Sequence, residues 1–493
     1  MSGIAGSVIT KEPRAENEPR DARGIPAERG VPLKLKQGLM RNPLRRFHNY
    51  RVPRQIARCG FPWDRVYTYC ETALSGQLAK NASWMFLGQG VSFAVQACYF
   101  VLLARLLGAD QYGIFVGAAA AVSLLSQYST LGSGMVLLRQ VSRHNGEFPQ
   151  YWGNVLLTTL SVGLLVIVSL AMFGKWMVGP ASASVIVLVA VGECTCARLA
   201  EGGGQAFQAF EQLKLTAALT SLTNIARLVT AAGMVLVLHR ATVRQWVIAS
   251  LAVSCLSAAM ALILVTTRLG LPKFDFHLLR KRALEGIGFS IAASTTSIYN
   301  DIDKAMLSRY GMLAANGIYS MAYRVVDMSC TPIRSLQSAA FPRFCQMGRN
   351  GARGSIGLTR RLLGKTLPFG LLAAVVMFLA APIIPYVVGR SFANSVSALQ
   401  WLCLLPVFRS LHLSAGDTLT GAGYQRYRTA AQLIAAALNF GLNLWLIPAY
   451  SWHGAAWSSL VTDGALAAGN WIVLSLLIRR ENHTVLESQV AAI

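Results

Sequence analysis

The chain has 493 residues, of which 54% are hydrophobic and 13% charged, and its formal net charge is +24. An ordinary soluble domain carries about 25% charged residues, so the composition excludes that class and indicates a protein that crosses a membrane. The positive charge lies in the first 80 residues and between apolar segments, which argues against nucleic acid as a partner.

The first 80 residues form a basic segment with fifteen Lys and Arg, seven acidic residues and frequent proline. Such a composition predicts a mostly disordered cytoplasmic tail over residues 1–80. The segment lacks the apolar core of a signal peptide, so we expect no cleavage. Basic and apolar residues mix from Lys34 to Ile56, and this leaves open a second interpretation, contact with the anionic lipids of the inner leaflet.

Twelve apolar segments of the length needed to cross a bilayer follow the tail. We expect membrane-spanning helices at about 82–105, 112–137, 153–174, 181–200, 213–238, 243–266, 285–308, 315–342, 366–388, 395–420, 428–448 and 454–478. The fold class is therefore an all-α integral membrane protein with about 12 transmembrane helices.

The charges of the connecting loops predict the orientation of these spans. Loops after even-numbered spans carry sixteen Lys and Arg residues, whereas loops after odd-numbered spans carry five. Short loops rich in Lys and Arg stay in the cytoplasm, so we expect both termini to be cytoplasmic.

An internal repeat divides the spans into two groups. A shift of 204 residues lays Leu103–Phe115 on Leu307–Tyr319 and pairs Gly113 with Gly317. Because the shift maps span 1 onto span 7, it predicts two parallel six-helix lobes around a central cavity lined by spans 1, 2, 7 and 8. The expected parts are an N-terminal lobe, a cytoplasmic linker, a C-terminal lobe and a cytoplasmic C-terminal tail, at 81–270, 271–282, 283–480 and 481–493.

Three stretches carry a family resemblance: "LARLLGADQYGIF" after span 1, "GIYSMAYRVVDMSCTPIRSLQSAAFPRF" in span 8, and "NFGLNLWLIPAYSWHGAAW" between spans 11 and 12. They resemble bacterial polysaccharide (O-antigen and exopolysaccharide) flippases of the multidrug, oligosaccharidyl-lipid and polysaccharide exporter superfamily. The resemblance covers about Asn81 to Arg480. Ser451 departs from it, because relatives usually carry glycine there.

The resemblance implies a transporter rather than an enzyme, located in the bacterial inner membrane. Its expected substrate is an oligosaccharide linked through pyrophosphate to a polyprenol, moved to the periplasmic leaflet by alternating access with H⁺ or Na⁺ as coupling ion. The lipid bilayer, and possible glycan polymerase and export machinery, are the expected partners. No phosphate-binding loop motif for ATP is found, and the triple glycine Gly202–Gly204 is interpreted as a flexible cytoplasmic turn.

Charged residues inside the spans are the candidate functional residues, since such residues normally face the bundle interior or water and mark a substrate or ion path. Arginine binds phosphate oxygens through its planar fork, so the candidate pyrophosphate ligands are Arg227, Arg324, Arg334 and Arg409. The candidates for ion coupling or gating are Asp301, Lys304, Asp327 and Asp463.

The spacing of these charges leaves two interpretations open. Asp301 and Lys304 are three residues apart, as are Arg324 and Asp327, so each couple shares a helix face and could form an ion pair that merely locks helices. Arg227, Arg409 and Asp463 have no opposite charge within one turn of their own helix, and they either pair across helices or face a wet cavity.

Two other functions compete with the flippase. A multidrug exporter of the same superfamily would need a cavity dominated by acids, and a membrane enzyme of glycan assembly would need a catalytic cluster. His412 is the histidine well inside a span, and no acid lies within one helical turn of it. Cys194 and Cys196 point to different faces of a helix, so we expect neither a metal site nor a cofactor.

Overall fold

The computed structural model describes residues 77–238, 240–348 and 351–490. They belong to the larger of two compact units of the chain, Tyr69–Ile493, while the smaller unit, Met1–Thr68, lies outside the described residues. The tail expected over residues 1–80 therefore lies outside them too, except for its last residues, which begin helix α2. Helices connected by short turns make up the described residues, with no strand among them.

The N-terminal half of the described chain provides the first six spans. Its elements are α2 (Gln77–Ser126), α3 (Ser133–Val141), η2 (Asn145–Glu147), α4 (Phe148–Val191), the π-helical turn η3 (Gly192–Cys196), α5 (Ala197–Ala209), α6 (Leu213–Leu238) and α7 (Val243–Leu269).

The C-terminal half provides the other six spans. Its elements are α8 (Phe276–Arg309), α9 (Leu313–Met347), α10 (Gly351–Ala380), η5 (Ala381–Ile383), α11 (Ile384–Val388), η6 (Arg390–Phe392), α12 (Ser395–Leu402), α13 (Leu405–Gly421), α14 (Gln425–Tyr450) and α15 (Trp452–Val490).

Two glycines turn the chain inside long helical runs and so create hairpins. Gly108 in α2 has φ 72° and Gly179 in α4 has φ 74°, values that glycine adopts without the steric cost a side chain would bring. Each residue marks the turn between two successive spans, which is why α2 and α4 are far longer than a bilayer requires. Ser451 also has a positive φ, 55°, at the position where glycine was expected from the family resemblance.

The number of spans agrees with the hydrophobic pattern. By length and composition, eight continuous helical stretches within the described residues are apolar enough to cross a membrane. Two of them, Phe93–Ser126 and Asn145–Ala209, contain the glycine kinks and hold two spans each. The helices α8 and α9 are absent from this set because they carry the charged residues of the candidate site. Counting them gives the twelve spans that the sequence predicts.

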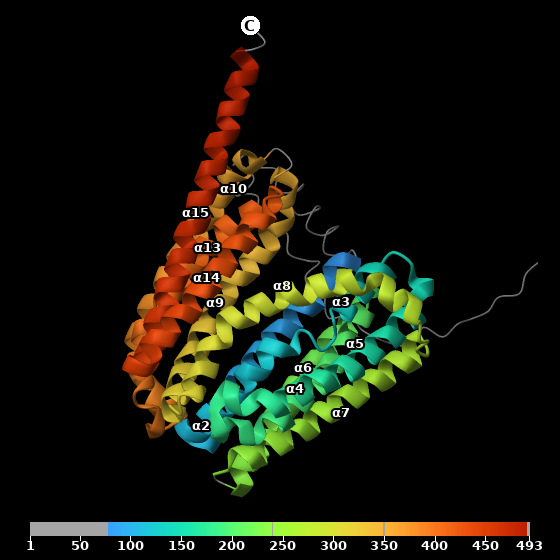
Figure 1. The fold of residues 1–493 in the computed structure, drawn as a ribbon, viewed down its shortest axis with the longest axis vertical. Coiled ribbons are helices and arrows are strands. Elements are labelled where there is room, and N and C mark those ends of the chain that lie inside the picture. The colour runs from blue at the N-terminus through green and yellow to red at the C-terminus, as the bar shows by residue number, and fades with distance from the viewer. Residues whose placement is uncertain (1–76, 239, 349–350, 491–493) are drawn as a thin grey trace, which may run out of the picture. The chain divides into compact units, whose positions relative to one another are not determined.

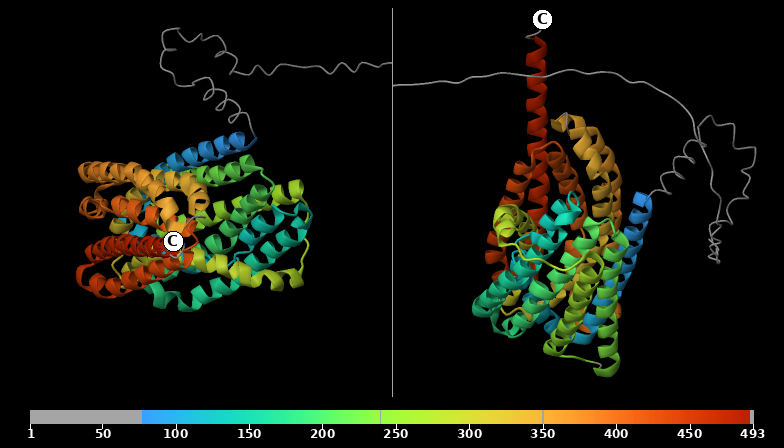
Figure 2. Two further views of the ribbon diagram at one scale, coloured as in Figure 1. Left: turned by 90° about the horizontal axis from the view of Figure 1, so that it is seen from above. Right: turned by 90° about the vertical axis from the view of Figure 1, so that its right-hand side faces the viewer.

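The helices form two lobes, as the sequence predicts. Figure 1 shows α3–α7 grouped together on one side and α10, α13, α14 and α15 on the other. In the view from above, the orange and red helices α10–α15 again lie apart from the green ones of the first lobe (Figure 2). Helix α8 crosses between the groups, because it packs against α2, α4 and α3 as well as against α14 and α9.

The triple glycine is part of a helix, so its interpretation as a flexible turn was wrong. Gly202–Gly204 lies within α5. Gly203 lets α5 approach α7, since a Cβ there would lie 3.1 Å from Cβ of Ala261. Close helix packing, rather than turn flexibility, is what this glycine provides.

The lobes meet at glycines that the repeat makes equivalent. A Cβ on Gly113 would lie 1.9 Å from the carbonyl oxygen of Leu313, and one on Gly317 would lie 2.1 Å from that of Ala109. A shift of 204 residues converts the first contact into the second, so this is a reciprocal contact of the kind that two-fold symmetry produces. The side-chain amide of Asn316 also donates to the carbonyl of Gly113 at 3.0 Å.

The loop charges predict the side of the membrane on which each turn lies, and cysteine labelling can test it. We expect the native Cys345, which is exposed near the end of α9, to react with a membrane-impermeant maleimide only after cells are permeabilised. A cysteine replacing Tyr450, which is 51% exposed, should react in intact cells. Both variants need a background without the other native thiols, and the reverse labelling pattern would invert the topology.

Candidate functional site

A cavity of about 310 Å³ lies between helices α2, α5, α6, α8 and α9 and the turn η3. Its charged lining residues are Arg198, Arg227, Lys304, Arg324, Glu193 and Asp301. Spans 1, 2, 7 and 8 contribute to it, as predicted, and spans 4 and 5 add to its wall. Four cationic side chains face two acidic ones, so the lining favours an anionic ligand.

Arg324 is the cation of this cavity that has no ion pair within the described residues. It lies on α9, and its guanidinium carbon is 4.4 Å from the ring centroid of Phe100 on α2, a geometry typical of a cation–π contact. Within the described residues no carboxylate lies within ion-pair distance of it, because Asp327 pairs with Arg334 and Arg409 instead. The ion pair between Arg324 and Asp327, one of the two interpretations that the sequence leaves open, is therefore not formed.

Arg227 both pairs across helices and faces the cavity. Its Nη2 lies 3.3 Å from Oε1 of Glu193 and donates to Oγ of Ser254 at 3.4 Å. Glu193 lies in the π-helical turn η3, an irregularity that changes which way the following side chains point and that often marks functional sites. Arg227 therefore fits both interpretations that the sequence leaves open, pairing across helices and facing a cavity.

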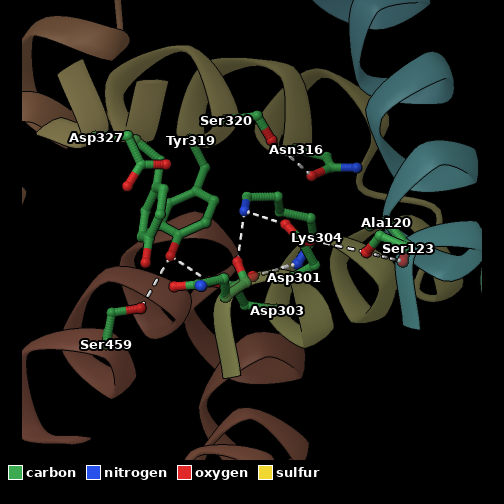
Figure 3. A network of polar contacts seen from close by, with 12 residues as sticks. Ala120, Ser123, Asp301, Asp303, Lys304, Asn316, Tyr319, Ser320, Asp327 and Ser459 are labelled. Atoms are coloured by element: carbon green, nitrogen blue, oxygen red, sulfur yellow. Dashed lines mark hydrogen bonds and ion pairs between the residues drawn. The ribbon is translucent and has the colours of Figure 1, made fainter. Parts of the chain in front are cut away.

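Asp301 and Lys304 form the predicted ion pair, with Nζ 2.7 Å from Oδ1. Lys304 also donates to the carbonyl oxygen of Asn300 at 2.5 Å, and Oγ of Ser123 donates to the other carboxylate oxygen of Asp301 at 2.7 Å. This network ties α8 to α2 (Figure 3). Since both charges are neutralised in place, their geometry fits a link between spans at the cavity wall.

A second network joins α8 to α9 and α15. The hydroxyl of Tyr319 donates to the carboxylate of Asp303 and lies 2.9 Å from Oγ of Ser459. Asp303 is 2% exposed, and Figure 3 shows Tyr319 placed between it and Ser459. Spans 7, 8 and 12 are thereby connected through the hydroxyl of Tyr319.

The remaining candidate residues gather in the C-terminal lobe, around Arg409. Its Nη1 lies 2.7 Å from Oδ1 of Asp327 and its Nε lies 3.5 Å from Oδ2 of Asp463. Its Nη2 donates to the hydroxyl of Tyr323 at 2.5 Å, while Arg334 reaches the same oxygen of Asp327 at 2.9 Å. Arg409 and Asp463 therefore pair across helices, which is one of the two alternatives that the sequence leaves open.

The four candidate arginines thus divide between two cavities. Arg227 and Arg324 line the cavity between the lobes, whereas Arg334 and Arg409 line a second one of about 250 Å³ together with His412 and other residues of α8, α13, α14 and α15. His412 Nε2 lies 4.0 Å from Oδ1 of Asp463 on span 12, a neighbour that its own helix could not reveal. No group of three metal-binding side chains occurs within the described residues.

Sequence reasoning missed two arginines. Arg198 lines the first cavity and lies 2.7 Å from Glu201, and Arg428 lines the second and lies 3.0 Å from Asp417. Arg428 begins the expected span 428–448 and is counted among the loop charges, whereas Arg198 lies near the end of the expected span 181–200. The three-residue spacing of Arg198 and Glu201 was the signal that could have placed the first on a helix face.

A family model described as polysaccharide biosynthesis protein matches residues 78–348. No curated protein matches the sequence. Solved structures with a similar fold include an inward-facing multidrug resistance MATE family transporter of the MOP superfamily, with TM-score 0.63, 12% identity, and coverage of 79% of this chain and 95% of that chain. The lipid II flippase MurJ in an inward closed conformation gives TM-score 0.63, 12% identity, and coverage of 80% and 87%.

A third similar structure is a MOP superfamily transporter from Pyrococcus furiosus, in which a reverse polarity of the binding pocket suggests a different function. It gives TM-score 0.55, 13% identity, and coverage of 82% of this chain and 97% of that chain. At such identities the likeness concerns the fold alone. It agrees with the twelve helices in two lobes.

Proposed function

Because the chain belongs to the polysaccharide biosynthesis protein family, we propose that it moves a polyprenyl-pyrophosphate-linked oligosaccharide across the bacterial inner membrane. The movement goes from the cytoplasmic to the periplasmic leaflet, by alternating access, and serves surface polysaccharide synthesis. The fold of a multi-pass transporter supports this proposal. The observation that carries it is the cationic cavity between the lobes, with Arg324 free to bind an anion.

The pyrophosphate of such a substrate fits this cavity chemically. It presents clustered anionic oxygens, which an arginine fork binds with two parallel hydrogen bonds. We assign Arg324 and Arg227 as its first ligands, with Arg334, 50% exposed on the second cavity, as a later contact during transport. Arg409 is 4% exposed and already bonded to Asp327 and Tyr323, so we assign it to holding this network.

A coupling ion has candidate positions beside these arginines. Asp327 and Asp463 share Arg409, and Oδ1 of Asp463 is buried without a hydrogen-bond partner within the described residues. Binding of H⁺ or Na⁺ at Asp463 would free Arg409 to strengthen its contact with Asp327. Such an exchange gives a physical route from ion binding to the packing of spans 8, 10 and 12. Asp301 and Lys304 would then transmit the change to span 2.

The competing function, export of cationic drugs, needs an unpaired acid in the cavity. Both acids there are paired, Glu193 with Arg227 and Asp301 with Lys304, whereas Arg324 is not. For the Pyrococcus transporter, too, a reversed pocket polarity suggests a different function. The charge of the cavity therefore favours the lipid-linked anion.

Replacing Arg324 tests the binding proposal. Hydrogen bonds to charged groups contribute about 1.5 to 3 kcal/mol net, so Arg324→Ala should weaken binding of undecaprenyl pyrophosphate roughly tenfold to hundredfold. Arg324→Lys should recover part of the loss, since it keeps the charge without the fork. Binding to the purified protein in detergent and polymer export in a strain without the gene are the two measurements.

A matched control is Arg361→Ala, which removes an exposed arginine of α10 far along the chain from the cavity. It should leave binding and export unchanged. If Arg324→Ala binds the lipid pyrophosphate as tightly as the unaltered protein, the cavity is not the pyrophosphate site and the proposal is wrong.

A further inference from the structure

A polar hollow of about 430 Å³ lies in the N-terminal lobe beside the cationic cavity. It is bounded by the turn η3 and helices α5, α6 and α7, and it shares Glu193, Asn224 and Arg227 with the cavity. We name it the α5 groove and define it by its uncharged polar lining residues Gln205, Gln208, Thr216, Thr220, Thr223, Asn224, Ser254 and Ser257. Its volume is larger than that of the cavity it adjoins.

Amide and hydroxyl side chains line the α5 groove. The amides of Asn224 and Gln208 have no hydrogen-bond partner within the described residues, although each offers donors and acceptors. The hydroxyl of Thr220 donates only to its own helix, at the carbonyl of Thr216. These side chains therefore offer open donors and acceptors to a polar ligand in the groove.

A second hollow, of about 240 Å³, lies on the other side of α5. It shares Glu201 and Gln205 with the α5 groove, and Gln127 and Arg198 with the cationic cavity. The amide of Gln127 also lacks a partner within the described residues. The three spaces are therefore adjacent, since common side chains line them.

The length of the groove suits a short chain of sugar rings. From Asn224 to Thr216 helix α6 rises by about 12 Å, at 1.5 Å per residue. Gly204 faces the groove from α5 and carries no side chain, so it leaves room where a larger residue would narrow the space. A chain attached to pyrophosphate at Arg227 and Arg324 would enter the groove at Asn224.

We propose that the α5 groove binds the oligosaccharide part of the transported lipid, an inference that rests on the function proposed above. Sugar hydroxyls both donate and accept hydrogen bonds, as side-chain amides and threonine hydroxyls do, so they would satisfy Asn224, Gln208 and Thr220 together. Phosphate contacts at the arginines then recognise every lipid pyrophosphate. The α5 groove recognises the sugar.

Two probes separate these roles: undecaprenyl pyrophosphate, and the lipid-linked oligosaccharide extracted from cells in which the gene is deleted. Gln208→Met, at a residue that lines the α5 groove but not the cationic cavity, keeps the side-chain length but removes the amide, and Thr220→Val removes the hydroxyl. Each should weaken binding of the oligosaccharide lipid about two- to tenfold, the effect of one hydrogen bond, and leave binding of undecaprenyl pyrophosphate unchanged. Arg324→Ala should weaken both.

The matched control is Thr267→Val on α7, an exposed threonine whose hydroxyl also bonds only to carbonyls of its own helix. It should change neither affinity. If Gln208→Met and Thr220→Val affect both probes equally or neither, the groove does not bind the sugar, while the effect of Arg324→Ala still supports pyrophosphate binding. If the unaltered protein binds neither probe, the proposed function itself fails.

Discussion

Alanine at Gly113 or Gly317 should abolish polymer export while leaving the protein in the membrane. These glycines form the reciprocal contact between the lobes, and a methyl group on either would overlap a backbone carbonyl oxygen of the facing helix, that of Leu313 or Ala109. Backbone atoms of packed helices yield less easily than the end of a side chain, so the lobes must separate at this end. Overpacking of this kind costs about 1–3 kcal/mol, which shifts the equilibrium away from the closed contact roughly 5- to 150-fold.

Spin labels can follow this separation directly. Trp176 in the first lobe and Tyr386 in the second are 73% and 84% exposed, and both lie in segments that the charge pattern places on the periplasmic side. Labelled cysteines at these positions should lie farther apart in the Gly113→Ala protein than in the parent. An alternating-access transporter must both close and open the contact between its lobes. A variant that keeps this contact open therefore cannot complete transport.

Gly288→Ala serves as the control for this prediction, because a Cβ at Gly288 in α8 meets nothing within 4 Å. It should export polymer normally and keep the parental distance between labels. Should Gly113→Ala export as well as Gly288→Ala does, the glycine contact is not part of the transport cycle.

Loss of Arg409 should instead destabilise the whole protein. The side chain is 5% exposed and bridges Asp327 on α9 to Asp463 on α15. Removing one partner of a buried ion pair costs about 3–5 kcal/mol, because the other charge is left uncompensated. We expect Arg409→Leu to lower the melting temperature in detergent and the amount of protein in the membrane.

A double variant shows whether the uncompensated charge is the cause. Asp463→Asn removes the charge that Arg409→Leu leaves buried, so the double variant should recover part of the lost stability. Arg324→Ala provides the contrast, since Arg324 has no ion pair within the described residues and its loss should reduce binding with little change in melting. A melting temperature of Arg409→Leu equal to that of the unaltered protein would refute the assignment of Arg409 to a structural network.

The sequence pattern alone predicts the spans, one ion pair and the equivalent glycines of the repeat. The twelve spans follow from the length of apolar segments, because a helix must be long and apolar enough to cross the hydrocarbon core. The ion pair between Asp301 and Lys304 follows from three-residue spacing on one helix. The pairing of Gly113 with Gly317 in the repeat also placed two equivalent residues before their contact was known, although not the contact itself.

Three-residue spacing does not lead to an ion pair between Arg324 and Asp327, because contacts with other helices determine where each side chain points. Both lie on one face of α9, but Arg324 extends towards Phe100 on α2 while Asp327 meets Arg409 from α13. Sequence spacing settles which side chains can meet on one helix, since helix geometry fixes those positions. Which helices face each other, and at what rotation, is decided by packing between spans far apart in the chain. That packing alone divided the four arginines between two cavities and opened the α5 groove beside the first.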